Sequence, residues 1–374
     1  MTPLNSIAGQ ETAKKILLSS FNRNRLASTY LFYGPDGVGK WSTALALTAL
    51  VNCEDPVKND AGEVLDACGR CLNCRQVLSL NFAEFYPAVP LPPHRSRTEA
   101  ADLVVEYIEA KKKEPYRTIV SSRQLTIPID TAREIKRRTA IKPPPGMTRV
   151  ILFYQMEKML PSSADSLLKL IEEPPPETII LLTTVDPDSL LPTIQSRSQK
   201  VAFKPLSPDD IVAYLKTRHE VTDKRANLLG RLSEGSIGRA LAFCDEEGES
   251  SLREIAFLMF KTLFIPETPA AVGTLNDLID PRNRGAAAQV LSHWQSFLSD
   301  IILLKYGADS TRVVNIDLAG DLEKMSVRFL EPDDISAMVE YLKNIGLMLR
   351  RNVHIRPALL ALALQMRRRI NQSS

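Results

Sequence analysis

Short apolar runs alternate with helical patterns over the first half of the chain. The runs at residues 31–33, 150–153 and 179–184 are rich in aromatic, leucine and β-branched side chains and are too short for helices, which predicts buried strands. Residues 8–25 and 41–51 have the length and pattern of helices. Because strands and helices alternate, we predict an α/β fold with a mostly parallel sheet and helices on both faces.

Two further segments of this half have less regular patterns. Residues 162–173 predict a helix that stops at three consecutive prolines. Residues 85–126 begin with several prolines and continue with a charged, amphipathic stretch at 99–113, so we interpret them as a surface insertion with one helix. We interpret the basic run at 111–113 as a solvated helix face rather than a DNA contact.

The pattern becomes helical after Ser207. Ser207 can act as an N-cap, and the proline and two acidic residues that follow are typical of a first helical turn. Helices are then predicted at 210–215, 223–232 and 238–244, and further along most clearly at 284–304, 335–350 and 355–369.

These patterns predict three domains. An α/β domain occupies residues 1–205, and a unit of three helices occupies 206–250. An all-α domain follows at 251–374. The helices of this last domain have apolar faces but no chemical motif, so we expect it to mediate oligomerisation.

The composition is that of an ordinary globular protein, with 44% apolar and 24% charged residues among 374. The net charge is only +3, so any contact with nucleic acid must come from a local basic patch or from a partner. No apolar stretch approaches the ~20 residues that a membrane-spanning helix needs. The N-terminus has no secretory pattern, and we therefore expect a cytoplasmic protein without a membrane partner.

Residues 34–40 carry a phosphate-binding loop, with the letters G-P-D-G-V-G-K directly after an apolar run. This spacing matches the P-loop pattern of a strand, a glycine-rich turn and a helix. Gly34, Gly37 and Gly39 allow backbone N–H groups to turn toward phosphate oxygens, and Lys40 can reach the terminal phosphates. We predict a genuine phosphate-binding fold, while occupancy by ATP or ADP stays open.

Two residues that would hold Mg²⁺ in such a site are missing. The position after Lys40 should carry the hydroxyl of Ser or Thr, but it holds Trp41. The strand at 150–153 should end in a carboxylate, but Tyr154 and Gln155 follow it. Glu157 is a poor substitute for this carboxylate, because it lies three residues beyond the position where the acid is expected. The sequence therefore predicts a nucleotide-binding scaffold without its metal chemistry.

Four of the five cysteines lie within 22 residues. Cys68, Cys71 and Cys74 are spaced two residues apart, and Cys53 precedes them across a loop. In a reducing compartment this clustering favours a metal over disulfides, and four thiolates suit a structural, tetrahedral Zn²⁺. A site without Cys53, or simply small buried cysteines, remain as alternatives. Cys244 stands alone and is interpreted as a core residue.

Four stretches are similar to the clamp-loader subunits of bacterial DNA polymerase III, in the AAA+ superfamily. Residues 7–10 (I-A-G-Q) resemble the family's entry motif, and the cysteines resemble its zinc module. Residues 164–175 (A-D-S-L-L-K-L-I-E-E-P-P) resemble a specific family run, and residues 193–198 (T-I-Q-S-R-S) resemble T-I-x-S-R-C. The resemblance implies that Arg197 acts in trans, as an arginine finger on a neighbour's nucleotide.

The departures from the family's catalytic gamma/tau members all point to its non-hydrolysing delta-prime branch. They include Trp41, the pair Tyr154 and Gln155, and Arg239, which is displaced by one position in the second-sensor motif. The resemblance also implies that residues 206–250 form a lid and that residues 251–374 form a collar.

The resemblance further implies a subunit of the DNA polymerase III holoenzyme without intrinsic ATPase activity. Its partners would be the gamma/tau and delta subunits and, indirectly, the sliding clamp and primer–template DNA. One alternative is a catalytic, gamma/tau-like ATPase subunit of the same loader. Another is an unrelated zinc-containing P-loop scaffold or nucleic-acid-binding module.

Overall fold

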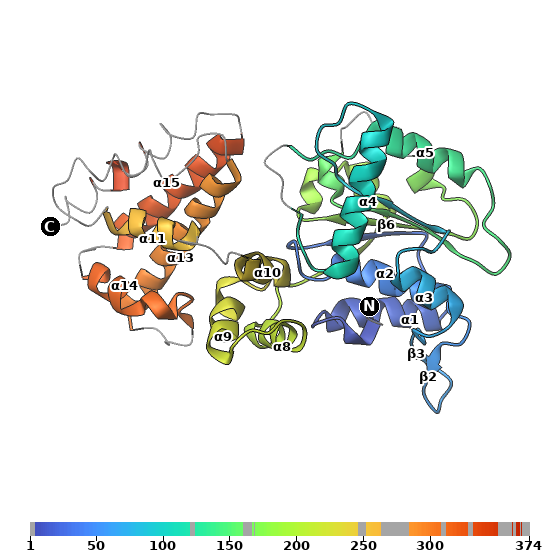
Figure 1. Cartoon of the computed structure of the whole chain (residues 1–374), viewed down its shortest axis with the longest axis horizontal. Helices are drawn as coiled ribbons and strands as arrows, with labels where there is room; N and C mark the ends of the chain where they lie inside the picture. Colours follow the sequence, from blue (N-terminus) through green and yellow to red (C-terminus); the bar gives the residue numbers. More distant parts are fainter. Residues whose placement is uncertain are drawn as a thin grey trace. The chain divides into compact units, whose positions relative to one another are not determined.

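The computed structural model describes residues 4–119, 124–159, 167, 169–245, 252–262, 284–307, 312–327 and 332–350, with a few residues between 361 and 368 (Figure 1). The chain divides into two compact units, Met1–Phe243 and Cys244–Ser374. The first unit contains both the sheet and the helices predicted at 206–250. The division into three domains at residues 205 and 250 stays a prediction.

A five-stranded parallel sheet forms the centre of the first unit, in the order β4-β5-β6-β1-β7. Its strands are β1 (Thr29–Tyr33), β4 (Phe85–Ala88), β5 (Arg149–Phe153), β6 (Thr178–Thr184) and β7 (Gln199–Ala202). The three strands predicted from apolar runs are confirmed as β1, β5 and β6. A separate hairpin pairs β2 (Val57–Lys58) with β3 (Val64–Asp66).

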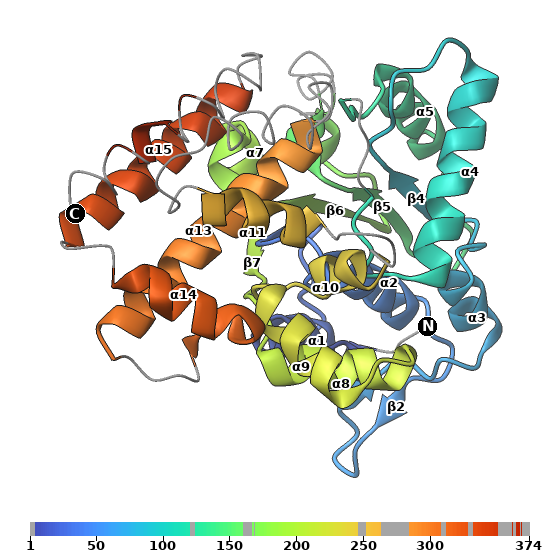
Figure 2. The same cartoon turned by 60° about the vertical axis from the view of Figure 1, so that its left-hand side comes forward.

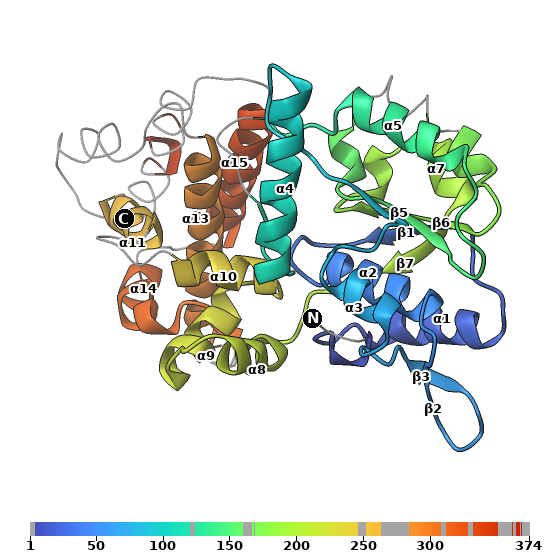
Figure 3. The same cartoon turned by 45° about the vertical axis from the view of Figure 1, so that its right-hand side comes forward.

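Helices cover both faces of the sheet, as Figure 3 shows for α1 and α2 on one side and α5 and α7 on the other. The helices that accompany the sheet are α1 (Glu11–Asn22), α2 (Lys40–Val51), α3 (Leu72–Leu78), α4 (Arg97–Lys113), α5 (Ile129–Thr139) and α7 (Pro192–Arg197). Single 3₁₀ turns occur at Leu4–Ser6, Met156–Lys158 and Pro187–Ser189. Val150 and Leu152 face one core, while Ile151 and Phe153 face the other. Because β5 is buried on both sides, its sequence is continuously apolar. Half of the helix predicted at 162–173 lies outside the described residues, and the described residues 167 and 169–172 are helical.

The interpretation of residues 85–126 as a surface insertion was wrong in two respects. Residues 85–88 form the edge strand β4, which pairs in parallel with β5. Pro87 obscured this strand in the sequence, because proline lacks the N–H group of a central strand and is tolerated at an edge. In addition, Tyr107 and Lys111 on α4 are buried, so the basic run at 111–113 is not wholly solvated.

Three helices complete the first unit: α8 (Pro208–Arg218), α9 (Asp223–Leu232) and α10 (Ile237–Asp245). The predicted helix start at Ser207 is confirmed. The Ser207 hydroxyl accepts a hydrogen bond from the Asp210 N–H, and the Asp210 carboxylate accepts one from the Ser207 N–H. This reciprocal capping box satisfies two backbone donors that the helix itself cannot pair.

The second unit is helical in its described part. It contains α11 (Leu252–Thr262), α13 (Arg284–Lys305), the 3₁₀ turn Ile316–Leu318, α14 (Ala319–Ser326) and α15 (Pro332–Arg350). Its core is built around Phe260, whose ring lies 6.0 Å from that of Trp294 and 5.4 Å from that of Phe297, centroid to centroid. The helix predicted at 355–369 lies mostly outside the described residues. Among the described helices, none is long and apolar enough to cross a membrane.

Candidate functional site

The phosphate-binding loop connects β1 to α2 and depends on its glycines. Gly34 has a φ of 140°, and a Cβ there would lie 2.0 Å from the Phe203 carbonyl oxygen. Gly37 has a φ of 71°, and a Cβ there would lie 2.5 Å from the Ser236 hydroxyl. Only glycine accommodates both the left-handed backbone and these close approaches.

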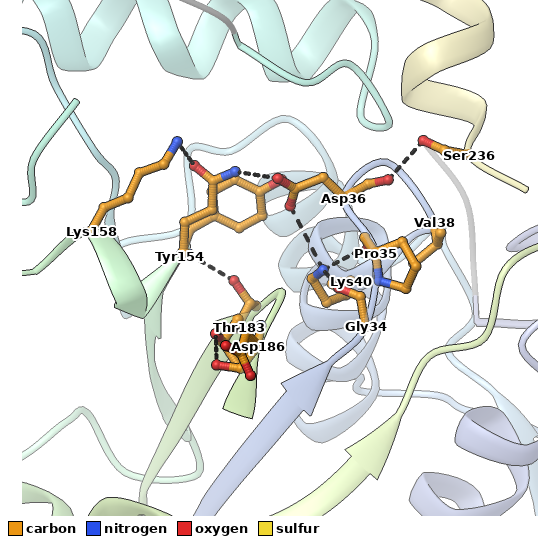
Figure 4. A network of polar contacts seen from close by, with 12 residues as sticks. Gly34, Pro35, Asp36, Val38, Lys40, Tyr154, Lys158, Thr183, Asp186 and Ser236 are labelled. Atoms are coloured by element: carbon orange, nitrogen blue, oxygen red, sulfur yellow. Dashed lines mark hydrogen bonds and ion pairs between the residues drawn. The ribbon is translucent and has the colours of Figure 1, made fainter. Parts of the chain in front are cut away.

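The Lys40 side chain is directed at its own loop (Figure 4). Its ammonium donates hydrogen bonds to the carbonyl oxygens of Gly34 and of Pro35, the latter at 2.7 Å. It also lies 3.7 Å from the Asp36 carboxylate. Burial lowers the pKa of Lys40, although Asp36 and Glu157 act in the opposite direction. A lysine that is satisfied in this way has few donors left for a phosphate.

The start of α10 packs on the same loop. The Ser236 hydroxyl donates a 2.7 Å hydrogen bond to the Asp36 carbonyl oxygen, and the Gly238 N–H donates to the Gly37 carbonyl oxygen at 3.2 Å. Ser236 and Gly238, about 200 positions later in the chain, therefore hydrogen-bond the phosphate-binding loop and cover it. Arg239, the displaced arginine of the second-sensor motif, pairs instead with Glu234.

Trp41 and Tyr154 occupy the two positions where metal ligands were expected, and they pack together. Trp41 is 1% exposed, and its indole meets the Tyr154 ring edge-on with centroids 5.3 Å apart. Phe85 on β4 and Tyr107 on α4 complete this aromatic cluster, at 6.4 and 6.3 Å from Trp41. Bulky rings therefore fill the positions from which a hydroxyl and a carboxylate would hold Mg²⁺.

The Lys111 ammonium lies against the same aromatic cluster. It is 5.4 Å from the centroid of the Trp41 ring and 4.8 Å from that of Tyr154, within cation–π range. It donates a 2.6 Å hydrogen bond to the Arg117 carbonyl oxygen. Burial lowers the pKa of Lys111 to about 7. Sequence reasoning missed this residue, although its spacing of four from Tyr107 places both on one helical face.

Gln155 and Glu157 do not restore a carboxylate at the end of β5. The Gln155 side chain donates to the Asp36 carboxylate at 2.9 Å, and its backbone N–H donates to the Thr183 hydroxyl at 2.8 Å. Glu157 lies near enough to Lys40 and Asp36 to interact with both charges, and burial raises its pKa. The strand end therefore carries an amide that is already hydrogen-bonded.

The four clustered cysteines converge, with all their sulfur atoms within 4.8 Å of one another. A tetrahedral zinc with Zn–S bonds of about 2.3 Å separates its sulfurs by about 3.8 Å, and Cys68 and Cys74 are 3.9 Å apart. Backbone N–H groups of the later cysteines donate to the Sγ atoms of Cys53, Cys68 and Cys71 at 3.3–3.4 Å. The donor set and its geometry fit a closed, structural metal site. Cys244 is only partly buried, contrary to its interpretation as a core residue.

Arg197 ends the short helix α7 and is accessible, with 43% of its side chain exposed. Its guanidinium lies 3.3 Å from the Glu172 carboxylate and donates to the Thr193 carbonyl oxygen at 3.2 Å. Within the first unit it is thus held at the surface by weak local contacts.

Comparison with known proteins gives consistent matches. A family model described as "DNA polymerase III, delta subunit" matches residues 9–207. The tau subunit of DNA polymerase III from Escherichia coli is 25% identical over 340 residues, which cover 87% of this chain and 46% of that protein. The delta' subunit from Bacillus subtilis is 27% identical over 248 residues, covering 66% of this chain and 63% of that protein.

Among solved structures, a DNA polymerase III gamma subunit-related protein from Thermotoga maritima aligns with 95% of this chain and 99% of its own length, at 15% identity and a TM-score of 0.44. The chain spans about half the length of the Escherichia coli relative. The family model covers more than half of the 374 residues, including the phosphate-binding loop, the four clustered cysteines and Arg197. The chain therefore belongs to the DNA polymerase III delta-subunit family, among the clamp-loader proteins of the AAA+ superfamily.

Proposed function

We propose that this chain is a non-hydrolysing, delta-prime-like subunit of a sliding-clamp loader. The observation that carries the proposal is the packing of Trp41 against Tyr154. Phosphoryl transfer needs a metal held by a hydroxyl and a carboxylate, and the rings leave neither group in place. The chain would thus contribute structure and a trans-acting residue to the loader, rather than its own ATPase activity.

The loop geometry also argues against tight nucleotide binding. Lys40 is engaged with the loop carbonyls, and Ser236 and Gly238 cover the loop from α10. A nucleotide would have to displace these contacts before it could use the backbone N–H groups. We therefore propose that ATP or ADP binding is weak or absent.

We further propose that Arg197 reaches the nucleotide of a neighbouring subunit. A guanidinium is permanently charged and offers a planar fork of donors suited to phosphate oxygens. Its pair with Glu172 is partly exposed and contributes little stability, so Arg197 can exchange it for a phosphate at low cost. Such a residue stabilises the charge that develops during phosphoryl transfer.

The partners in this proposal are the gamma/tau and delta subunits, and through them the clamp and primer–template DNA. Relatives that carry the tau and delta' names support this assignment. The helices of the second unit form the proposed collar that packs with these subunits. The cysteine cluster would hold one Zn²⁺ as a structural ion.

The decisive experiment is reconstitution with gamma/tau, delta and clamp, followed by an ATPase assay. Removal of an arginine finger typically lowers turnover about 10³- to 10⁵-fold at one active site. Because a ring has several sites, Arg197→Ala should cause a partial loss of clamp- and DNA-stimulated ATPase activity. Glu172→Gln is the matched control, since it breaks the same surface pair but keeps the guanidinium. Equal activities of Arg197→Ala and Glu172→Gln would refute the trans role.

A catalytic, gamma/tau-like subunit is the competing function, and the match to tau over 87% of the chain favours it. The two functions predict different ATPase activities for the isolated chain. Mg²⁺-dependent ATP hydrolysis that Lys40→Ala abolishes would establish the catalytic alternative. Our proposal predicts ATP hydrolysis at background level in both the unmodified chain and the Lys40→Ala variant.

A further inference from the structure

Residues 114–118, called the post-α4 segment below, lie between the phosphate-binding loop and the helices α8 and α10. Figure 2 shows the lower end of α4 next to α2 and α10. The segment belongs to the stretch that the sequence pattern assigned to a surface insertion, yet Glu114 and Tyr116 are only 7% and 4% exposed. It is therefore packed inside the first unit, with different partners on its two sides.

On one side the post-α4 segment covers the phosphate-binding loop. The Tyr116 hydroxyl accepts a 3.0 Å hydrogen bond from the Ala8 N–H. The Tyr116 ring lies on Gly39, where an added Cβ would be 3.2 Å from the Cε1 atom of the ring. Gly39 is the N-cap of α2, and the N-terminus of a helix after a glycine-rich loop is where a phosphate binds. Tyr116 therefore covers the surface that a nucleotide would need.

On the other side the post-α4 segment is bound to α8 and α10. The Tyr214 hydroxyl donates a hydrogen bond to one oxygen of the buried Glu114 carboxylate, and His219 Nε2 lies 3.1 Å from the other. The rings of Tyr116 and Tyr214 meet edge-on, with centroids 4.9 Å apart. At the start of α10, a Cβ on Gly238 would lie 2.7 Å from the Tyr116 carbonyl oxygen. Because hydrogen bonds to a charged group are strong, Glu114 fixes α8 to the segment.

Lys111 fixes the conformation of the post-α4 segment. Its buried ammonium donates hydrogen bonds to the carbonyl oxygens of Pro115 at 3.3 Å and Arg117 at 2.6 Å. The Arg117 N–H donates to the Glu114 carbonyl oxygen at 3.1 Å, which closes a turn. These bonds are made within a few residues of one chain, so the segment is preorganised and needs no ligand to place it.

We propose that the post-α4 segment takes the place of a nucleotide in this chain, because it covers the phosphate-binding loop and joins α8 and α10 to the rest of the first unit. A nucleotide at the loop would have to displace Tyr116 from Gly39. The segment therefore competes with ATP, and it holds the three helices α8 to α10 in one position without ATP. This inference rests on the proposed weak nucleotide binding and assigns its cause to one segment.

The first test titrates the full isolated chain with ATP, without Mg²⁺, by isothermal titration calorimetry. Tyr116→Ala removes the ring that covers Gly39 and leaves the loop itself unchanged. A closed site weakens the apparent affinity in proportion to the fraction of molecules that are open, so this variant should bind ATP at least about tenfold more tightly than the unmodified chain. Adding Lys40→Ala to Tyr116→Ala should reverse the gain, because ATP then loses the lysine of the loop.

The second test follows hydrogen exchange of the α8 and α10 amides by mass spectrometry. Tyr214→Phe removes the hydroxyl that joins α8 to Glu114. The matched control is Tyr30→Phe, which removes a β1 hydroxyl that accepts the Ala27 N–H at 3.0 Å. We expect exchange in α8 and α10 to be about tenfold faster in Tyr214→Phe, because a buried carboxylate loses a donor, and unchanged there in Tyr30→Phe.

Equal ATP affinity of the unmodified chain and Tyr116→Ala would overturn the proposal. Equal exchange rates of α8 and α10 in Tyr214→Phe and Tyr30→Phe would also overturn it. Neither measurement depends on ATP hydrolysis or on partner subunits. A failure of this inference is therefore distinguishable from a failure of the proposed function, which Mg²⁺-dependent hydrolysis by the unmodified chain would reveal.

Discussion

The indole of Trp41 and the phenol of Tyr154 meet edge to face, with centroids 5.3 Å apart and ring planes at 89°. The two residues are separated by more than a hundred positions in the chain, and each replaces a different metal ligand of a hydrolysing P-loop. Because the two rings pack together, both residues that depart from the catalytic pattern belong to one buried aromatic cluster. A single substitution toward the catalytic pattern would therefore damage the fold without restoring the chemistry.

The first prediction concerns Trp41→Thr, which restores a hydroxyl. We expect a loss of about 3–5 kcal/mol in the stability of the first unit, because a large buried ring is removed. ATPase activity should stay at background, since Tyr154 still supplies no carboxylate. Hydrogen exchange of the β1 and β5 amides in increasing urea measures the stability. Trp41→Phe, which keeps an aromatic ring, should lose clearly less stability. A Trp41→Thr protein that is as stable as the unmodified chain and hydrolyses ATP would contradict the prediction.

Lys111 should make stability depend on pH. Burial lowers its pKa from 10.5 to about 7 in the folded state. Between these values the unfolded chain binds a proton that the folded chain lacks, so stability rises as the pH rises from about 7 toward 10.5. The slope approaches about 1.4 kcal/mol per pH unit. Below about pH 7 both states are protonated, and the contribution to the slope vanishes.

The corresponding measurement compares the unmodified chain with Lys111→Met between pH 7 and 9. The unmodified chain should gain about 2 kcal/mol relative to the variant over this window. Lys112→Met is the control, because Lys112 is more exposed and pairs with Glu109 at the surface. Parallel pH profiles for the unmodified chain and Lys111→Met would show that Lys111 does not titrate in this range.

The cysteine cluster predicts one Zn²⁺ per chain in elemental analysis of reduced protein. Cys71→Ser should lower both the zinc content and the stability of the region around α3, because metal binding is coupled to local folding. Cys244→Ser should leave the zinc content unchanged, as Cys244 is not part of the cluster. Carefully purified protein without zinc would rule out the structural ion.

A buried ion pair fixes the edge strand to the sheet. Arg149 on β5 contacts Glu84, which precedes β4, at 2.7 Å, and both side chains are almost wholly buried. Glu84→Gln should cost about 3–5 kcal/mol, because it leaves a buried guanidinium without its counter-charge. The exposed pair Arg70–Asp55 serves as the control, and Asp55→Asn should change stability by less than about 1 kcal/mol. Urea unfolding of the two variants measures these losses of stability. Similar losses for Glu84→Gln and Asp55→Asn would contradict the prediction.

The last prediction concerns the second unit. A chain that ends at Asp245 retains the whole sheet and the helices α8 to α10, so its first unit should keep its fold by circular dichroism. It should fail to assemble with gamma/tau and delta, because the proposed collar is gone. Assembly at undiminished affinity, measured by size-exclusion chromatography with the partners, would disprove a collar role for residues 251–374.

Local patterns were sufficient for the features that depend on neighbours in the chain. The strand, glycine turn and helix around residues 30–51 follow from their own residue types, as does the capping box at Ser207. The convergence of Cys68, Cys71 and Cys74 also follows from their spacing on one helix start. Such elements are decided by backbone geometry and hydrogen bonds over a few residues, which a single sequence displays directly.

The tertiary structure decided which of these elements cover one another. Lys111 looked like a surface residue because lysine usually keeps its charge in water, yet here aromatic rings and carbonyl oxygens replace that water. Likewise, the sequence showed that Trp41 and Tyr154 are unusual residues but not that they touch, and it gave no sign that α10 closes the loop at Gly37. Sequence periodicity identifies the face that a helix or strand buries, whereas the partner on that face is selected by packing across the whole fold.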